Sequence, residues 1–130
     1  MRKLKLPGRN SEGPRLNDTD FTIIEDEGIP GIKKQARQIV ERKLREQLEN
    51  DGKQTPHAGN PVYKAMHACK CSSRREISRA HRIPAGRDLN DNEIDSIVNL
   101  LTRWIVREYN FYIEEEKAQQ KNLNQYDSEE

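Results

Sequence analysis

Two long stretches of the chain repeat apolar residues at helical spacing. Residues 30–49 carry one apolar stripe among basic and acidic residues, formed by Ile32, Ala36, Ile39, Val40, Leu44 and Leu48. Residues 90–116 carry a second stripe, formed by Ile94, Ile97, Val98, Leu101, Trp104, Ile105 and Tyr112. A single apolar stripe with polar surroundings is typical of an amphipathic helix that packs on a core. We therefore predict a helix in each stretch and a buried Trp104.

Capping signals predict two shorter helices between these stretches. Asn60 precedes Pro61, which favours a helix over residues 61–70. Ser73 and Glu76 have capping-box spacing, which favours a helix over residues 73–82, and Asn90 begins the last helix in the same way. No segment shows the alternation of a strand. The predicted fold class is all-α, a compact bundle of about four helices.

Composition limits this bundle to the middle of the chain. Of the 130 residues, 32% are hydrophobic and 35% are charged, which leaves room for one small core. We predict a flexible basic arm over residues 1–19, a single helical domain over 20–117 and an acidic polar tail over 118–130. The apolar patch Phe21-Thr22-Ile23-Ile24 could pack on the domain or form an isolated extended segment. No apolar run reaches the roughly 20 residues of a membrane span, and no secretory signal is recognisable, so we expect a cytoplasmic protein without a membrane partner.

Although the net charge is only +1, the chain contains two acidic and two basic segments. Residues 17–29 and 108–130 each carry a net charge of −5, whereas residues 1–16 carry +4 and residues 62–90 carry +5. Clustered guanidinium and ammonium groups can bind phosphates. The candidate binding residues are therefore six of the seven bases in residues 62–90: Lys70, Arg74, Arg75, Arg79, Arg82 and Arg87. A helix would place Arg75, Arg79 and Arg82 on one face. The alternative is a solvated face that pairs with the acidic segments.

The only two cysteines lie close to two of the three histidines. His67, Cys69, Cys71 and His81 supply two nitrogens and two sulfurs, which suits tetrahedral zinc. The alternative is that both cysteines are buried structural thiols and that His67 is hydrogen-bonded. A Cys–His pair could also form a nucleophile, but no oxyanion-hole signature accompanies it.

A series of motifs in the middle of the chain resembles a known family. The motifs are Gly52-Lys53-Gln54-Thr55-Pro56, Gly59-Asn60-Pro61-Val62, His67-Ala68, Ile83-Pro84-Ala85-Gly86-Arg87-Asp88-Leu89 and Trp104-Ile105. Their order and spacing resemble a small bacterial and phage domain family of unknown function. The resemblance implies three cysteines and a histidine as metal ligands, but here Ser72, Ser73 and Glu76 occupy the cysteine positions and only His81 remains. We therefore expect no cofactor, and zinc only in the alternative site described above.

These observations favour a small binding or regulatory protein over an enzyme. We expect it to contact nucleic acid, or a protein that handles nucleic acid, through the basic helical face, and the resemblance is compatible with a phage-encoded protein. One alternative is a metal-binding domain or metal-dependent enzyme that uses His67, Cys69, Cys71 and His81. A second alternative is an inhibitor whose acidic tail binds a basic protein partner. The sequence indicates no oligomeric state.

Overall fold

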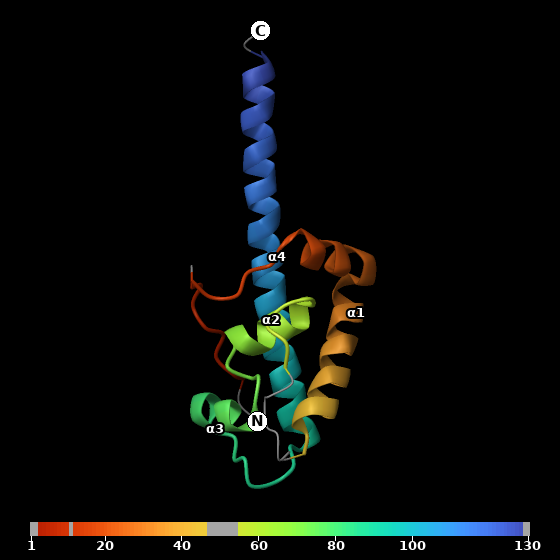
Figure 1. Cartoon of the computed structure of the whole chain (residues 1–130), viewed down its shortest axis with the longest axis vertical. Helices are drawn as coiled ribbons and strands as arrows, with labels where there is room; N and C mark the ends of the chain where they lie inside the picture. The colour runs from red at the N-terminus through yellow and green to blue at the C-terminus, as the bar shows by residue number, and fades with distance from the viewer. Residues whose placement is uncertain (1–2, 11, 47–54, 129–130) are drawn as a thin grey trace.

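Four helices make up the described parts of the fold, and the longest of them extends well past the other three (Figure 1). The computed structural model describes residues 3–10, 12–46 and 55–128, and the side chains of these residues as far as Gln119. Within those ranges there is no strand, and the helices are α1 (Asp18–Leu44), α2 (Pro61–Ala68), α3 (Arg74–His81) and α4 (Asp91–Ser128). The all-α prediction is confirmed, and the bounds of the two short helices agree with it to within two residues.

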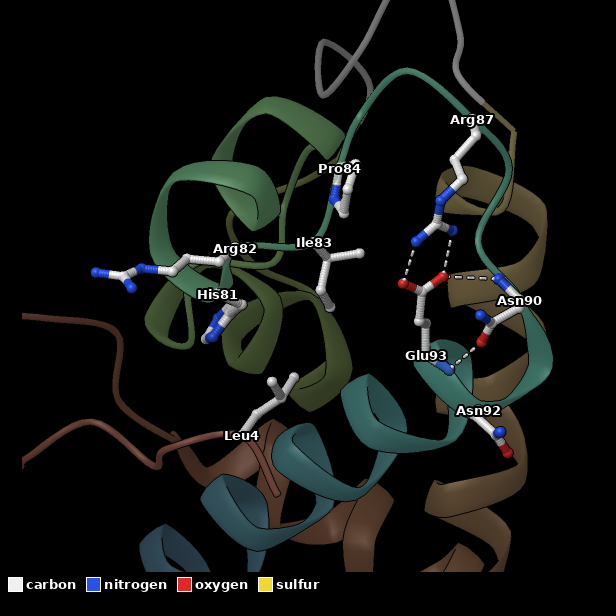
Figure 2. Close-up of a pocket in the computed structure, with 9 residues that line it drawn as sticks. All are labelled: Leu4, His81, Arg82, Ile83, Pro84, Arg87, Asn90, Asn92 and Glu93. Carbon is white, nitrogen blue, oxygen red and sulfur yellow. Dashed lines mark hydrogen bonds and ion pairs between the residues drawn. The ribbon is translucent and has the colours of Figure 1, made fainter. Parts of the chain in front are cut away.

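Polar caps begin α2, α3 and α4 where the sequence places them. The Asn60 side chain accepts from the backbone N–H of Val62, and the Ser73 side chain accepts from Glu76. Asn90 and Glu93 form the reciprocal pair of a complete capping box (Figure 2). At α3 the box is incomplete, because the Glu76 carboxylate accepts from the backbone and hydroxyl of Ser72 instead of the backbone of Ser73.

α1 begins twelve residues before the predicted helix and bends in the middle. Gly28 has a φ of 72° and breaks the helix just before Pro30. The preceding segment is helical, so the extended alternative for residues 21–24 is wrong. Asn17 and Asp20 form a capping box at its start, and Phe21 packs on α4.

The first segment of α1 packs on α4 through aromatic rings. Phe21 stacks with Tyr109 and Tyr112, with ring centroids 5.3 and 4.6 Å apart. The two tyrosine hydroxyls donate to Glu25 and Asp18 of the same α1 segment. These contacts engage two of the acidic residues of this segment with α4.

The core lies where α4 meets α1 and α2, and α1 also contacts α2. Trp104 is 3% exposed, which confirms its predicted burial. Beyond the core α4 continues to Ser128 and extends past the other helices, so the predicted end near residue 116 is too early (Figure 1). Glu114, Glu115 and Glu116 are exposed on this part. No helix among the described residues combines the length and apolar character needed to cross a lipid bilayer.

The described start of the predicted flexible arm, residues 3–10, lies against α4. The Leu4 side chain is 5% exposed and belongs to the core. Arg103 and Arg107 of α4 each donate a hydrogen bond of 2.5 Å to a backbone carbonyl of the arm, at Leu4 and Pro7. Side chains of α4 thus satisfy backbone groups of a segment that has no regular structure of its own.

A charged contact holds the arm further along α4. The Arg9 guanidinium lies 2.9 Å from the Glu108 carboxylate and 3.8 Å from the centre of the Phe111 ring. The Glu108 side chain is 7% exposed, and it also accepts from Arg107. The arm and α4 are therefore joined by apolar, polar and ionic contacts.

Candidate functional site

α3 is a short helix with one buried side and one strongly basic side. Ile77 is fully buried, and because a helical turn takes 3.6 residues, Arg75 and Arg79 lie on the exposed side. Arg82 follows the helix in the left-handed conformation, with a φ of 58°, and is also exposed. We call Arg75, Arg79 and Arg82 the α3 arginine face.

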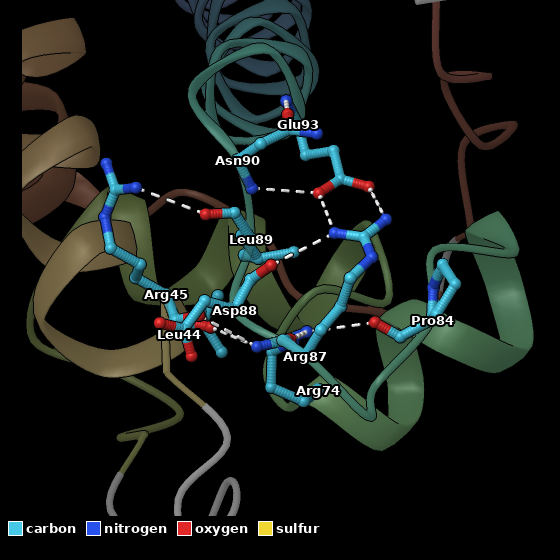
Figure 3. A network of polar contacts seen from close by, with 9 residues as sticks. All are labelled: Leu44, Arg45, Arg74, Pro84, Arg87, Asp88, Leu89, Asn90 and Glu93. Carbon is cyan, nitrogen blue, oxygen red and sulfur yellow. Dashed lines mark hydrogen bonds and ion pairs between the residues drawn. The ribbon is translucent and has the colours of Figure 1, made fainter.

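Arg74 does not belong to this face, contrary to the sequence-based prediction. It is 1% exposed, and its guanidinium donates to four backbone carbonyls, which we call the Arg74 junction (Figure 3). Nη1 lies 3.0 Å from the carbonyl oxygens of Leu44 and Arg45, and Nη2 lies 3.0 and 2.5 Å from those of Pro84 and Arg87.

The Arg74 junction joins three parts of the chain. Leu44 and Arg45 end α1, where backbone carbonyls have no partner within the helix and the helix dipole is negative. A cation at this position is favourable because it donates to these carbonyls and because its charge is opposite to that end of the dipole. The other two carbonyls belong to the loop between α3 and α4, so Arg74 ties α3 and this loop to the end of α1.

Arg87 is also unavailable as an unpaired cation. Its two terminal nitrogens lie 2.7 and 2.8 Å from the two Glu93 carboxylate oxygens, in a bidentate pair (Figures 2 and 3). Glu93 also accepts from the backbone N–H of Asn90. The Arg87 hydrogen bond, more than the other contacts, holds the pKa of Glu93 below its ordinary value. Arg87 therefore stabilises the start of α4, and its charge is neutralised locally.

Lys70 lies at the end of α2. It is exposed and has a φ of 59°, because α2 closes with two hydrogen bonds that require a left-handed residue there. The backbone N–H of Cys71 donates to Met66, and that of Lys70 donates to His67. Lys70 lines a cavity of about 230 Å³, whereas Arg82 lines a separate one of about 370 Å³. Of the six predicted residues, the structure thus gathers three on one face.

The alternative metal ligands are not brought together. His67 Nε2 lies 3.2 and 3.1 Å from the carbonyl oxygens of Thr55 and Pro56, and its ring stacks on His57. His81 lies instead beside Cys71. In the described parts of the chain, no group of three or more His, Cys, Asp or Glu side chains is arranged to hold a metal ion.

The cysteines and His81 do not form a nucleophilic pair. Burial raises the pKa of Cys69 to about 12 and raises the pKa of Cys71 well above its ordinary value, so both remain thiols at neutral pH. His81 Nε2 lies 2.8 Å from the Cys69 carbonyl oxygen and 3.5 Å from Cys71 Sγ. A carbonyl can only accept, so this geometry assigns the tautomer with the proton on Nε2, in which Nε2 donates to Cys69 and is not a base for the thiol.

The positions at which the resemblance implies cysteines hold a hydrogen-bonded polar group instead. The Ser72 hydroxyl donates to Glu76 over 2.6 Å, and the Ser72 carbonyl accepts from Thr55 over 3.1 Å. These bonds fasten the start of α3 to residue 55. Of the motif that contains Thr55, residues Gly52, Lys53 and Gln54 lie outside the described residues.

One feature near the arginine face was not predicted from the sequence. Arg82 lines the larger cavity together with His81, Leu4 and the beginning of α4 (Figure 2). No local pattern indicates that the arm reaches this point, because Leu4 stands among Gly, Pro and basic residues without periodicity. Its burial brings the neighbouring Lys3, which is exposed, to the same end of the molecule.

A family model described as a domain of unknown function (DUF4186) matches residues 9–106, which include every motif on which the sequence resemblance rests. No solved structure matches the chain.

Proposed function

The chain belongs to this family of unknown function, and from that premise we propose that it is a small non-enzymatic protein that binds nucleic acid through the α3 arginine face. The observation that carries the proposal is the different treatment of arginines in one molecule. Arg74 and Arg87 bind backbone and carboxylate groups of the fold, whereas Arg79 and Arg82 are exposed on and just after one short helix, close in sequence to the exposed Arg75. Guanidinium groups in such a row suit the phosphates of a nucleic-acid backbone.

Some arginines on other helices are paired with carboxylates. Arg37 contacts Glu41 and Asp95, and Arg45 contacts Glu41 and Asp91. Among the described residues, Arg79 and Arg82 have no such ion pair. Two positive charges without a local counterion favour an external anion.

Three of the acidic residues that the intramolecular alternative would pair with the basic face have other partners. Asp18 and Glu25 accept from tyrosines of α4, and Asp20 forms a buried pair with Lys64 over 2.5 Å. These three carboxylates therefore contact α4 and α2 rather than Arg79 or Arg82. The raised pKa values of both cysteines likewise support a binding role over nucleophilic catalysis.

The test is the salt dependence of nucleic-acid binding by a charge-reversal variant. Fluorescently labelled DNA should bind at low salt, and log K should fall linearly with log[salt], by about 0.9 per phosphate neutralised on duplex DNA. In Arg79→Glu/Arg82→Glu, binding should fall by at least about tenfold and the slope should decrease by about 2, because each lost cation removes about one phosphate contact.

A double variant on α1 tests whether the position of the reversed charges matters or only the change in net charge. Lys34→Glu/Arg42→Glu changes the net charge equally at exposed positions of another helix. It should retain most of the affinity and slope, and circular dichroism should show that both variants keep their helical content. Equal weakening of binding by both variants, or no binding by the wild type at about 50 mM salt, would refute the proposal.

A further inference from the structure

The cavity that Arg82 lines lies between the end of α3 and the start of α4 and has an apolar wall. Its volume is about 370 Å³, and Leu4, Ile83 and Pro84 line one part of it (Figure 2). Leu4 and Ile83 are only 5% and 2% exposed, so their positions are fixed by the core. A pocket of this size with a rigid apolar wall suits a small planar group.

The opposite wall carries groups that can read hydrogen-bond donors and acceptors. The Arg87–Glu93 pair is fixed, because Glu93 also accepts from the backbone of Asn90. Asn92 lies beside it on the first turn of α4, and its side chain is exposed. A side-chain amide offers both a donor and an acceptor, which is the combination found on the edges of nucleobases.

The cavity adjoins the α3 arginine face. Arg82 lines it from the side of α3, and its guanidinium extends away from the Arg87–Glu93 pair (Figure 2). Arg79 precedes Arg82 by three residues, at the end of the same helix. A nucleic-acid backbone bound along the arginines would therefore pass the entrance of this cavity. One wall of the cavity is apolar, and the other carries the Asn92 amide.

From this arrangement we propose that the cavity takes one unpaired base of a single-stranded nucleic acid whose phosphates lie on the α3 arginine face. The inference rests on the proposed function and specifies the ligand as a single-stranded nucleic acid. Bases of a duplex are stacked and paired, so their faces cannot enter a cavity unless a base is flipped out. An unpaired base can be splayed out, packed on a side chain and hydrogen-bonded along its edge.

The experiment fills the cavity without changing its charge. Labelled oligothymidylate, oligoadenylate of equal length and the duplex of the two are titrated with wild type and with Asn92→Trp. Wild type should prefer a single strand to the duplex, and Asn92→Trp should weaken single-strand binding by about tenfold, the effect of losing one stacked base. Duplex binding should remain unchanged in this variant. Asn110→Trp is the matched control, since Asn110 is an exposed asparagine of the same helix outside this cavity.

The outcomes separate this inference from the proposed function. If duplex and single strands bind equally, and Asn92→Trp has no effect, the cavity is not a base site but the arginine face still binds nucleic acid. If no oligonucleotide binds, both proposals fail. A polyglutamate peptide that binds as tightly as the oligonucleotides, with no effect of Asn92→Trp, would overturn the inference in favour of an acidic protein partner.

Discussion

Arg74 and Arg79 lie on the same eight-residue helix, but one arginine is buried in the Arg74 junction and the other is exposed on the α3 arginine face. The Arg74 guanidinium donates to four carbonyls (Figure 3). Arg79, at the other end of the helix, is exposed. The helix turns by about 100° per residue, so neighbours such as Arg74 and Arg75 point in different directions. The net charge of residues 62–90 therefore overestimates how basic the surface is, because the buried Arg74 uses its charge to hold the fold together.

The largest expected effect comes from removing the buried guanidinium. Arg74→Met keeps much of the aliphatic length but leaves four carbonyls without this donor, so we expect a loss of about 3–5 kcal/mol in the free energy of unfolding. Arg79→Met makes the same change at an exposed position of the same helix and should cost no more than about 0.5 kcal/mol. Urea unfolding followed by circular dichroism measures both. Equal stabilities of the two variants would show that the junction is not structural.

A smaller effect on stability is expected at the ion pair between Arg87 and Glu93. Because the pKa of Glu93 is lowered in the folded protein, its contribution to stability is complete above the ordinary glutamate pKa and is lost as the pH falls through the lowered value. Glu93→Gln cannot titrate but can still cap α4, so its stability should decline less steeply than that of the wild type below about pH 4.5. Urea unfolding at a series of pH values measures the slope. Glu46→Gln, at an exposed position, should follow the wild-type curve, and a wild-type slope in Glu93→Gln would contradict the assignment.

The same comparison shows how far sequence reasoning reaches. The apolar stripes and the polar caps depend on local spacing, and they located all four helices. The inward position of Arg74 had one local signal, because it lies three residues before the buried Ile77 and therefore shares its face. That signal could not reveal the acceptors, which are backbone carbonyls about 10 and 30 residues away in sequence.

Two other features depend on long-range contacts that no spacing encodes. The burial of Leu4 depends on α4, about 100 residues away, so the arm gave no periodic signal and the cavity it helps to line was missed. The first segment of α1 did have a local signal, since Asn17 and Asp20 stand at capping-box spacing. Its run of acidic residues resembled a loop, and the stacking of Phe21 on two tyrosines of α4 shows what stabilises it as a helix.

The smallest expected effect on stability is at Arg82, where it separates the contribution of this residue to binding from its effect on folding. Arg82 has a φ of 58°, a conformation that costs an L-residue about 1 kcal/mol and that glycine adopts without this penalty. Arg82→Gly should therefore raise the free energy of unfolding by about 1 kcal/mol while weakening nucleic-acid binding, because a phosphate contact is lost. Arg82→Ala should weaken binding equally without the gain in stability. Thermal unfolding and the oligonucleotide titration measure the two properties on the same samples. A glycine variant that binds as tightly as the wild type would remove Arg82 from the arginine face, whereas one that binds weakly and unfolds at a higher temperature would show that this residue serves binding at the expense of stability.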